Sequence, residues 1–580
     1  MKILLVSVDA KFIHTNLAVH SLTSYSDKYK ENIHIAQYSI NHTKEEILRG
    51  IYLHGADIVA FSCYIWNIDM IVSIIESLKK VQPQVKIWFG GPEVSYNPKD
   101  CLLKYKDLDG IVIGEGEQTF YELIEYYLEC GKEMEDIRGL AFKKSARREV
   151  IGNSNEDSII QTQAREAISL DEIPFAYSDI ESQRNKIIYY ESSRGCPYTC
   201  SYCLSSAHRG VRLRNLDLVK KELKILLDHN VPQIKFVDRT FNCNKEHAME
   251  IWRFIKEHDN GITNFHFEIT ADLLTDEELN ILKNLRPGLV QFEIGVQTTN
   301  PVTMDAIRRK VDFNKLAERV RQIKSGNNIH QHLDLIAGLP WEDYSSFEKS
   351  FQDVYKLKPD QLQLGFLKVL KGSMMEEECK QHGIVYNNEP PYEVLYTNHL
   401  SYDEIIELKG ICSMVEVYYN SGQFAYTMEY LEHYFDSPMK LYASLYHYYE
   451  ERGLYSLAHS RVRRYEILLD YYNERLAGEY EKDRNAFKEI LLYDLCLREA
   501  LRNRPDYIGE PIPYKSYRLI IDKYRLNKSR IHLEKFKYDV VESAKQGKAI
   551  EKEAIILFDY DSRDPITNSA RVQVIKDFSL

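Results

Sequence analysis

Short apolar runs alternate with helical patterns in two separate stretches of this chain, and that alternation restricts its fold more than any other feature. In the first stretch, residues 1–140, the apolar runs are Ile3–Val8, Ile58–Phe61, Val85–Phe89 and Gly110–Ile113. Asn67–Val81 lies between two of these runs, and its apolar residues recur at three- and four-residue spacing, which predicts a helix. Because strands that alternate with helices form parallel sheets, we predict a doubly wound α/β domain over 1–140.

The second stretch, residues 186–370, contains six apolar runs separated by helical patterns. The runs are Lys186–Tyr190, Gln233–Val237, Phe265–Ile269, Leu289–Val296, His332–Ile336 and Gln361–Val369. Six strands with helices between them predict a partial (β/α)6 barrel. A chain of 580 residues exceeds what one hydrophobic core can support, so about three domains are expected.

The segments outside these two stretches have a different composition. Residues 141–185 are polar and irregular, which predicts a linker, with a small strand pair at Gly139–Phe142. Residues 371–580 are rich in tyrosine and acidic residues and carry long helical patterns over Tyr402–Tyr419 and Asp483–Arg502. We predict a mainly helical C-terminal domain with one late strand at Ala554–Phe558.

Three of the ten cysteines, Cys196, Cys200 and Cys203, lie together at CxxxCxxC spacing directly after a predicted strand. Thiolates are soft ligands that suit iron–sulfur clusters, and three of them leave one iron of a 4Fe-4S cluster open for another ligand. A zinc site with His208 as fourth ligand is the alternative, although structural zinc sites usually combine two closely spaced pairs. We predict that the three cysteines are cluster ligands.

The segment Glu191–Cys203 resembles the cluster loop of the radical S-adenosylmethionine (SAM) superfamily, including the aromatic Tyr202 before the third cysteine. The resemblance implies that the open iron chelates the methionine part of SAM. It also implies that an electron from the cluster cleaves SAM to a 5′-deoxyadenosyl radical, which abstracts hydrogen from a substrate. The three cysteines would then be catalytic as well as metal-binding, and Tyr202 would belong to the cofactor site.

Polar residues near the ends of the later strands resemble the SAM-contacting positions of coproporphyrinogen-oxidase-like radical enzymes. The matching residues are Glu268, Gln297, Arg309 and Asp334. Carboxylates can accept hydrogen bonds from the ribose hydroxyls, and arginine can pair with the SAM carboxylate. The second strand departs from the family pattern and ends at Asp238, which we also assign to cofactor binding. The alternative for each carboxylate taken alone is a solvated or salt-bridged residue.

The sheet predicted for 1–140 resembles the cobalamin-binding (B12-binding) domain found in one subgroup of radical SAM enzymes. Ser62 and the pair Gly90 and Gly91 match small residues of that domain, whereas the loop that supplies a cobalt-ligating histidine is absent. His14 in the corresponding loop is expected to be a packing residue. Two alternatives follow: the domain binds cobalamin, or it keeps the fold for packing or substrate contact.

The overall layout resembles that of queuine lyase, which implies radical cleavage of queuosine 5′-phosphate with release of queuine. Basic residues near the cluster loop would then bind the phosphate, although a salt bridge is the simpler role for each. The candidates are Arg194, Arg209, Arg212 and Arg214. The alternatives are a cobalamin-dependent radical SAM methyltransferase and a non-catalytic sensor that binds SAM and a cluster. A reducing partner such as flavodoxin or ferredoxin is implied for either enzyme.

The charge and the N-terminal sequence exclude several other classes. A net charge of -12 and a pI near 5.9 argue against a large basic surface for DNA. Charged residues follow the first apolar run within a few positions, which is untypical of a signal peptide. No apolar stretch reaches the roughly 18 residues of a membrane span, so we expect a cytoplasmic protein that acts on a small molecule.

Overall fold

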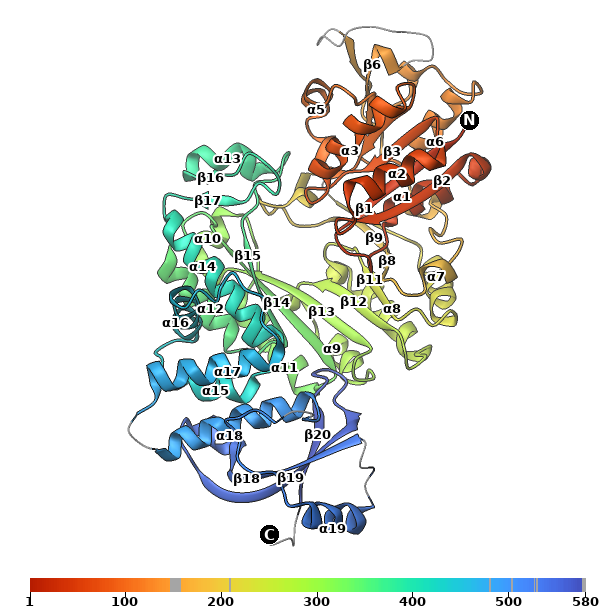
Figure 1. The fold of residues 1–580 in the computed structure, drawn as a ribbon. Helices are drawn as coiled ribbons and strands as arrows, with labels where there is room; N and C mark the ends of the chain where they lie inside the picture. Colours follow the sequence, from red (N-terminus) through yellow and green to blue (C-terminus); the bar gives the residue numbers. More distant parts are fainter. Residues whose placement is uncertain are drawn as a thin grey trace. The chain divides into compact units, whose positions relative to one another are not determined.

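The computed structural model describes residues 1–146, 158–207, 210–478, 481–501, 504–525, 527 and 530–575. The chain forms two compact units (Figure 1). Unit 1 comprises Met1–Phe292, Met304–Asp312 and Phe366–Thr397, and unit 2 comprises Glu293–Thr303, Phe313–Gly365 and Asn398–Leu580. Residues 147–157 of the predicted linker lie outside the described residues. Domain boundaries at 140, 185 and 370 stay predictions.

The N-terminal part of unit 1 is built on a seven-stranded sheet of order β2-β1-β3-β4-β5-β6-β7. Its strands are β1 (Ile3–Asp9), β2 (Ile33–Ser39), β3 (Ile58–Ser62), β4 (Lys86–Gly90), β5 (Gly110–Val112), β6 (Leu140–Lys143) and β7 (Ile159–Gln161). The first five strands are parallel, with Ile3 opposite both Ile33 and Ile58, and the last two run antiparallel. β6 and β7 thus extend this sheet with residues that the sequence assigns largely to a linker.

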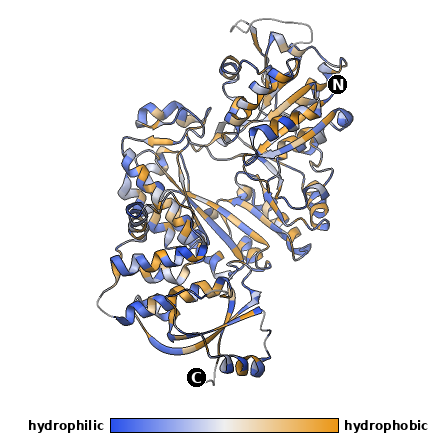
Figure 2. Cartoon of the chain, viewed as in Figure 1, coloured by the Kyte–Doolittle hydropathy of each residue, from blue (hydrophilic) through white to orange (hydrophobic). Residues whose placement is uncertain are grey.

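Helices cover both faces of this sheet, as the doubly wound prediction requires. They are α1 (Leu17–Tyr25), α2 (Lys44–His54), α3 (Ile68–Val81), α4 (Pro92–Ser95), α5 (Pro98–Lys104) and α6 (Glu117–Tyr127). One apolar core joins the sheet to α2, α3 and α5, and a second core joins the other face to α1 and α6. Figure 2 shows the strands between these helices in the colour of hydrophobic residues, which is typical of strands buried on both faces.

The barrel predicted for 186–370 is present as a six-stranded sheet of order β15-β14-β13-β12-β11-β8. Its strands are β8 (Ile188–Tyr190), β11 (Gln233–Phe236), β12 (Asn264–Ile269), β13 (Val290–Gln297), β14 (Ile329–Ala337) and β15 (Gln361–Phe366). The helices of this region are α7 (Leu216–Asp228), α8 (Lys245–Glu257), α9 (Asp276–Lys283), α10 (Pro301–Ala306), α11 (Phe313–Gly326) and α12 (Tyr344–Tyr355). β8, β11 and β12 are parallel neighbours in unit 1, and the boundary between the units falls inside β13.

The segment after β15 returns to unit 1 before the C-terminal domain begins in unit 2. It contains α13 (Met374–His382) and the short strands β16 (Val385–Tyr386) and β17 (Val394–Tyr396). The C-terminal helices are α14 (Tyr402–Val415), α15 (Ala425–Glu432), α16 (Pro438–Glu451), α17 (Arg461–Tyr471), α18 (Glu481–Arg498), α19 (Tyr514–Tyr524) and α20 (Val540–Gln546). The mainly helical prediction is therefore confirmed.

The prediction of one late strand is wrong. The C-terminal domain ends in a three-stranded antiparallel sheet made of β18 (Ile531–Tyr538), β19 (Glu551–Arg563) and β20 (Ala570–Ile575). The polar ends of β19 and the exposed middle of β20 hide these strands from a search for apolar runs.

Many tyrosines are buried between the helices, among them Tyr418, Tyr430 and Tyr442.

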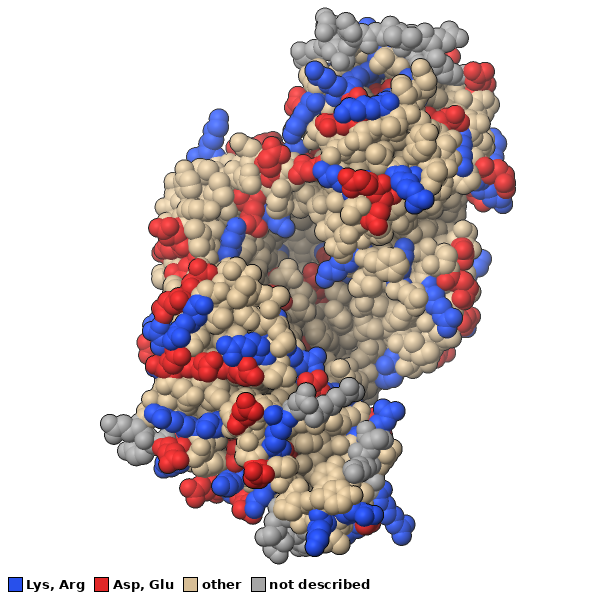
Figure 3. All heavy atoms as spheres, viewed as in Figure 1, with Lys and Arg blue, Asp and Glu red and all other residues tan. Residues whose placement is uncertain are grey.

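The visible face of the molecule carries acidic and basic side chains interspersed over its surface (Figure 3). No extended basic area is seen on this face. Among the helices of the described ranges, none is long and apolar enough to cross a bilayer.

Candidate functional site

The first cysteine of the predicted cluster loop is the last residue in the first strand of a short β-hairpin. β9 (Ser193–Cys196) pairs antiparallel with β10 (Gly210–Leu213), and Cys196 lies opposite Gly210. Gly195 has a φ of 103°, and a Cβ atom there would lie 2.1 Å from the carbonyl oxygen of Gly210. Only glycine fits such a position, so the hairpin sets the backbone course into Cys196. The sequence analysis did not predict this hairpin because its residues are mostly polar or glycine.

Cys200 and Cys203 follow in a turn held by backbone hydrogen bonds. The N–H of Cys203 donates to the carbonyl of Cys200 at 3.1 Å. All three motif cysteines are free thiols; Cys200 is buried, and the other two are half-buried. Within the described part of the chain, no three His, Cys, Asp or Glu side chains converge closely enough to hold a metal ion. The donor set nevertheless suits an iron–sulfur cluster, since three soft thiols come from one short segment and none is used in a disulfide.

Three of the predicted site residues, Cys200, Tyr202 and Arg309, lie together. The Arg309 Nη1 atom lies 3.9 Å from Cys200 Sγ and donates to the Tyr202 hydroxyl at 3.4 Å. Burial raises the pKa of the Cys200 thiol, and the Arg309 charge opposes that rise because it favours the thiolate. Arg309 comes from the segment Met304–Asp312, which belongs to unit 1 with the cluster loop. The structure therefore places a cation beside the central cysteine.

Asp238 binds the residues that lead into the first cysteine of the loop. Its carboxylate is fully buried and accepts hydrogen bonds from the hydroxyls of Ser192 and Ser193, both at 2.6 Å, and from the N–H of Ser192 at 3.0 Å. Burial raises its pKa to about 6. Both oxygens thus hold the residues that lead into Cys196, and the role predicted for Asp238 as a direct cofactor contact stays a prediction.

The other predicted SAM contacts are half-buried residues of the later strands. Glu268 precedes the last residue of β12 and belongs to unit 1. Gln297 is the last residue of β13, and Asp334 lies in β14, with Oδ1 3.0 Å from His332 Nε2; both belong to unit 2. Each residue is thus near or at the carboxyl half of its strand, and its role as a SAM contact stays a prediction.

The carboxyl ends of the N-terminal strands carry the small and polar residues predicted from the sequence. Asn16 donates from its side-chain amide to Asp9 at 3.3 Å and to Ser62 at 3.4 Å, and burial raises the pKa of Asp9 to about 6. Gly91 has a φ of 111°, and a Cβ there would lie 2.5 Å from the carbonyl oxygen of Cys63. This glycine is needed for packing inside the domain. Gly114 also has a positive φ, but nothing lies within 4 Å of its Cβ position.

The arginines proposed for a substrate phosphate are already paired. Arg194 forms ion pairs with Glu191 at 2.7 Å, Glu117 at 2.9 Å and Glu115 at 3.0 Å. Arg212 pairs with Glu115, and Arg214 pairs with Glu222 at 2.6 Å. The salt-bridge alternative is therefore confirmed for these three, and Arg209 lies outside the described residues. Because Glu115 and Glu117 belong to the N-terminal domain, Arg194 ties that domain to the cluster hairpin.

His14 is a packing residue, as expected. Its Nδ1 atom lies 2.7 Å from the Tyr189 hydroxyl, which joins the loop after β1 to β8. Burial lowers the pKa of His14. The ring is therefore engaged with the barrel strand.

Arg239 is a candidate that the sequence analysis missed. It is exposed, and within the described ranges no carboxylate lies in ion-pair distance of it. Burial raises the pKa of the phenols of Tyr64 and Tyr96, and the nearby Arg239 charge opposes that rise. Its neighbour Thr240 lies 3.6 Å from Cys196, measured between Oγ1 and Sγ. The signal available in the sequence was a basic residue three positions after the end of β11.

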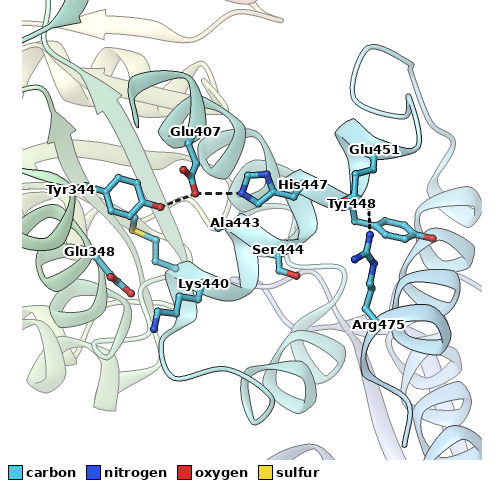
Figure 4. Close-up of a pocket in the computed structure, with 11 residues that line it drawn as sticks. Tyr344, Glu348, Glu407, Lys440, Ala443, Ser444, His447, Tyr448, Glu451 and Arg475 are labelled. Carbon is cyan, nitrogen blue, oxygen red and sulfur yellow. Dashed lines mark hydrogen bonds and ion pairs between the residues drawn. The ribbon is translucent and has the colours of Figure 1, made fainter. Parts of the chain in front are cut away.

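Unit 2 has a separate hollow of about 430 Å³ between α12, α14, α16 and the segment Tyr472–Leu476 that follows α17 (Figure 4). Glu407 accepts a hydrogen bond from the Tyr344 hydroxyl at 3.0 Å and lies 3.5 Å from His447 Nε2. Arg475 on its rim pairs with Glu451. Glu348 accepts from the Ser437 hydroxyl and Lys440 pairs with Asp436 at 3.1 Å, so the charged groups of this hollow have partners and we assign no ligand to it.

Models of three known families match separate parts of the chain. Residues 3–124 match the B12 binding domain, and residues 190–354 match the radical SAM superfamily. The chain therefore contains a B12-binding domain and a radical SAM domain. Residues 380–558 match a family described as "Protein of unknown function (DUF4080)". The cofactors of this radical SAM protein are a 4Fe-4S cluster and SAM.

Two curated relatives resemble this radical SAM protein over most of their length. An uncharacterized methyltransferase of Pyrococcus horikoshii is 26% identical over 383 residues, which cover 64% of this chain and 78% of the relative. The cobalamin-dependent radical SAM methyltransferase TokK of Streptomyces tokunonensis is 22% identical over 498 residues, which cover 79% of this chain and 68% of the relative. These relatives support the methyltransferase alternative and give no support to the lyase.

A solved structure shares the fold. The cobalamin-dependent SAM radical enzyme OxsB, with aqua-cobalamin bound, superposes with a TM-score of 0.59 at 14% identity, covering 85% of this chain and 80% of that one. The likeness confirms the predicted α/β architecture with its N-terminal sheet, partial barrel and helical C-terminal region.

Proposed function

We propose that this chain is a cobalamin-dependent radical SAM methyltransferase. The observation that supports this most is the link between the cluster hairpin and the B12-binding sheet. Arg194, two residues before Cys196, binds Glu117 at the start of α6 and Glu115 in the loop after β5. The edge of the sheet at which doubly wound domains bind ligands therefore also anchors the cluster hairpin. The relatives include TokK, which is named as such a methyltransferase.

In this proposal, Cys196, Cys200 and Cys203 hold the cluster, and Asp238 keeps the preceding residues in place. Arg309, Glu268, Gln297 and Asp334 contact SAM. When bound and reduced by an external electron donor, the cluster would supply reductive cleavage of SAM, and cobalamin would carry the methyl group. The polar edge at Ser62 and the open space over Gly114 suit the approach of a corrinoid to backbone atoms.

A second candidate is the release of queuine from queuosine 5′-phosphate. Arg239 favours it, because an exposed arginine that lacks an ion-pair partner among the described residues is a suitable ligand for a phosphate. The guanidinium group can form two parallel hydrogen bonds to phosphate oxygens, which gives about 1.5–3 kcal/mol per charged hydrogen bond. Arg253 provides a matched control, since it pairs with Glu250 at 3.0 Å on α8.

The test is anaerobic reconstitution with iron, sulfide and cobalamin, followed by product analysis with SAM and a strong reductant. We expect wild-type protein to form 5′-deoxyadenosine and Cys200→Ala to form none. Cys412→Ala removes a half-buried cysteine outside the motif and should keep full turnover. Persistent 5′-deoxyadenosine formation by Cys200→Ala would show that the radical assignment is wrong.

The same reactions separate the two candidates. A methyltransferase should retain corrinoid, visible in its absorbance spectrum, and form S-adenosylhomocysteine together with 5′-deoxyadenosine. Queuine release from queuosine 5′-phosphate without S-adenosylhomocysteine would replace the first candidate by the second. In that case Arg239→Gln should raise the KM for the nucleotide by about tenfold or more, while Arg253→Gln should leave it unchanged.

A further inference from the structure

A buried carboxyl group joins the loops that follow β13 and β14 in unit 2. Glu342, in the loop between β14 and α12, has a relative exposure of 1%. Its Oε1 atom accepts hydrogen bonds from the Thr298 hydroxyl at 2.5 Å and from the Ser350 hydroxyl at 3.2 Å. Thr298 directly follows Gln297, the last residue of β13, and Ser350 lies in α12. One carboxyl group therefore connects three elements.

The hydrogen bonds continue through the backbone of the loop after β13. The N–H of Thr299 donates to Ser350 Oγ at 3.0 Å, and the N–H of Asn300 donates to Thr298 Oγ1 at 3.0 Å. The Asn300 side chain donates to the carbonyl of Trp341 at 3.1 Å. Thr298 and Asn300 are thus hydrogen-bonded to the loop after β14, and Thr299 is hydrogen-bonded to α12.

The backbone on both sides of this network is in an unfavourable conformation. Gln297 has a φ of 72° and Trp341 a φ of 62°, in the left-handed region that side chains larger than glycine rarely adopt. Such conformations persist only where the surrounding structure holds them, and they cluster at ligand sites. The network around Glu342 immediately adjoins both strained residues and is well placed to hold them.

The second carboxyl oxygen of Glu342 is buried and has no hydrogen-bond partner among the described residues. Burial raises the pKa of this group to about 7, and the charge of Asp343 adds to the rise. A neutral carboxyl group can accept both hydroxyl bonds on one oxygen without the desolvation penalty of a charge. The protonated acid and the glutamine amide are then nearly the same shape, with an NH2 group in place of the OH group.

We propose that Glu342 is a positioning residue that clamps Thr298 and so holds Gln297 in the conformation in which it contacts SAM. This inference rests on the proposed function, which assigns Gln297 to the SAM site. Gln297 ends its strand with a strained φ, so the direction of its side chain depends on the residue that follows it. Without the clamp, the loop should relax to an ordinary conformation and turn the side chain away.

The variant that removes the clamp is Glu342→Met, which keeps a similar volume and has no strong acceptor. Glu342→Gln keeps the acceptor and is the rescue variant. Asp360→Asn is the matched control, because Asp360 accepts from the N–H of Gln331 at 2.8 Å near the opposite end of β14. Thr298→Val removes the donor of the same hydrogen bond and replaces Glu342→Met if that variant does not fold.

The first measurement is amide hydrogen exchange in the full chain, which needs no bound cofactor. We expect Glu342→Met to speed exchange at Thr299 and Asn300 by about tenfold or more, whereas Glu342→Gln and Asp360→Asn stay close to wild type. The second is SAM turnover by the reconstituted enzyme. Glu342→Met should raise the KM for SAM by about tenfold with a smaller change in kcat, and Glu342→Gln should stay within about threefold of wild type.

The outcomes are distinct. Unchanged exchange in Glu342→Met, or faster exchange with an unchanged KM for SAM, would overturn the positioning role while leaving the proposed function intact. An equal rise in KM for Asp360→Asn would also overturn it, since a general loss of strand stability would then explain the effect. A wild-type enzyme that binds no SAM would overturn the proposed function itself and the role of Gln297 with it.

Discussion

Replacing Asp238 by alanine should release the residues that lead into the cluster loop. The carboxylate accepts three hydrogen bonds, from the hydroxyls of Ser192 and Ser193 at 2.6 Å and from the N–H of Ser192 at 3.0 Å. These donors are buried with it, so no water replaces the lost acceptor. Ser192 Oγ also lies 3.1 Å from His247 Nε2, and that contact can satisfy one of the three donors.

The expected loss of stability follows from these contacts. Each buried donor left without an acceptor costs about 1–3 kcal/mol, and two of the three remain unsatisfied once His247 takes one. We therefore expect Asp238→Ala to lower the unfolding free energy of unit 1 by about 2–6 kcal/mol. Asp238→Asn keeps one carbonyl oxygen in place for the two hydroxyls, but it sets an NH2 group against the N–H of Ser192. Its cost should be smaller, about 1–3 kcal/mol.

The assay measures urea denaturation of the chain together with its iron and sulfide content after reconstitution. Asp494→Ala is the matched control, because Asp494 is also fully buried and accepts from the Thr427 hydroxyl and the N–H groups of Thr427 and Tyr426 in unit 2. Both variants should lose stability, and only Asp238→Ala should lose cluster. A wild-type iron content in Asp238→Ala, or an equal loss of iron in Asp494→Ala, would refute the holding role.

Three further predictions concern the charged groups of both units. Arg194→Met leaves Glu191, Glu117 and Glu115 without their shared cation, so urea denaturation should show a loss of about 2–4 kcal/mol, smaller at pH 5 and partly restored in Arg194→Lys. Burial raises the pKa of Asp494 to about 7, whereas the unfolded chain releases this proton near pH 4. The unfolding free energy should therefore fall as the pH rises from about 4 to about 7, by at most about 4 kcal/mol. In Asp494→Asn the fall should be smaller in denaturation curves recorded over this range, by the part that Asp494 contributes; an unchanged slope would contradict the assignment. Glu93→Gln removes the charge that pairs with Lys371, whose Nζ lies 2.8 Å away. In thermal unfolding curves the midpoint of unit 1 should fall, and the midpoint of unit 2 should stay the same.

The sequence predicts strands well where burial on both faces makes them continuously apolar. β1, β3 and β4 lie inside the parallel sheet and are within one or two residues of the predicted runs. β2 was missed because it is an edge strand, and half-buried residues interrupt its buried ones. The hairpin of β9 and β10 was missed for another reason, since its pairing depends on a close backbone approach at Gly195 rather than on apolar side chains.

The sequence predicts the candidate cluster and cofactor residues, but it does not predict the contacts that hold those residues in place. The spacing of the three cysteines and the resemblance of Arg309 to a cofactor contact point to one place, and the structure brings Cys200 and Arg309 within 3.9 Å. The direction of the Asp238 side chain depends instead on two serines that are far away in the sequence. Likewise, the pairing of Arg194 with Glu117 joins residues that share no local pattern. Ion pairs between distant segments leave no periodic signal, so a basic cluster looks the same whether it is paired or free.

Contacts of the segment after β15 also connect the N-terminal domain of unit 1 to the cluster loop. Ser201, between the second and third cysteines, donates its N–H to Ile307 at 3.0 Å and accepts from the N–H of Met375 at 2.8 Å. Gly372 packs so closely on Tyr96 that a Cβ there would lie 2.1 Å from the ring, and Lys371 binds Glu93 in the helix after β4. Five consecutive residues, 371–375, therefore connect the strand ends of the N-terminal sheet to the cluster loop. This connection is short and is anchored at both ends by contacts within unit 1.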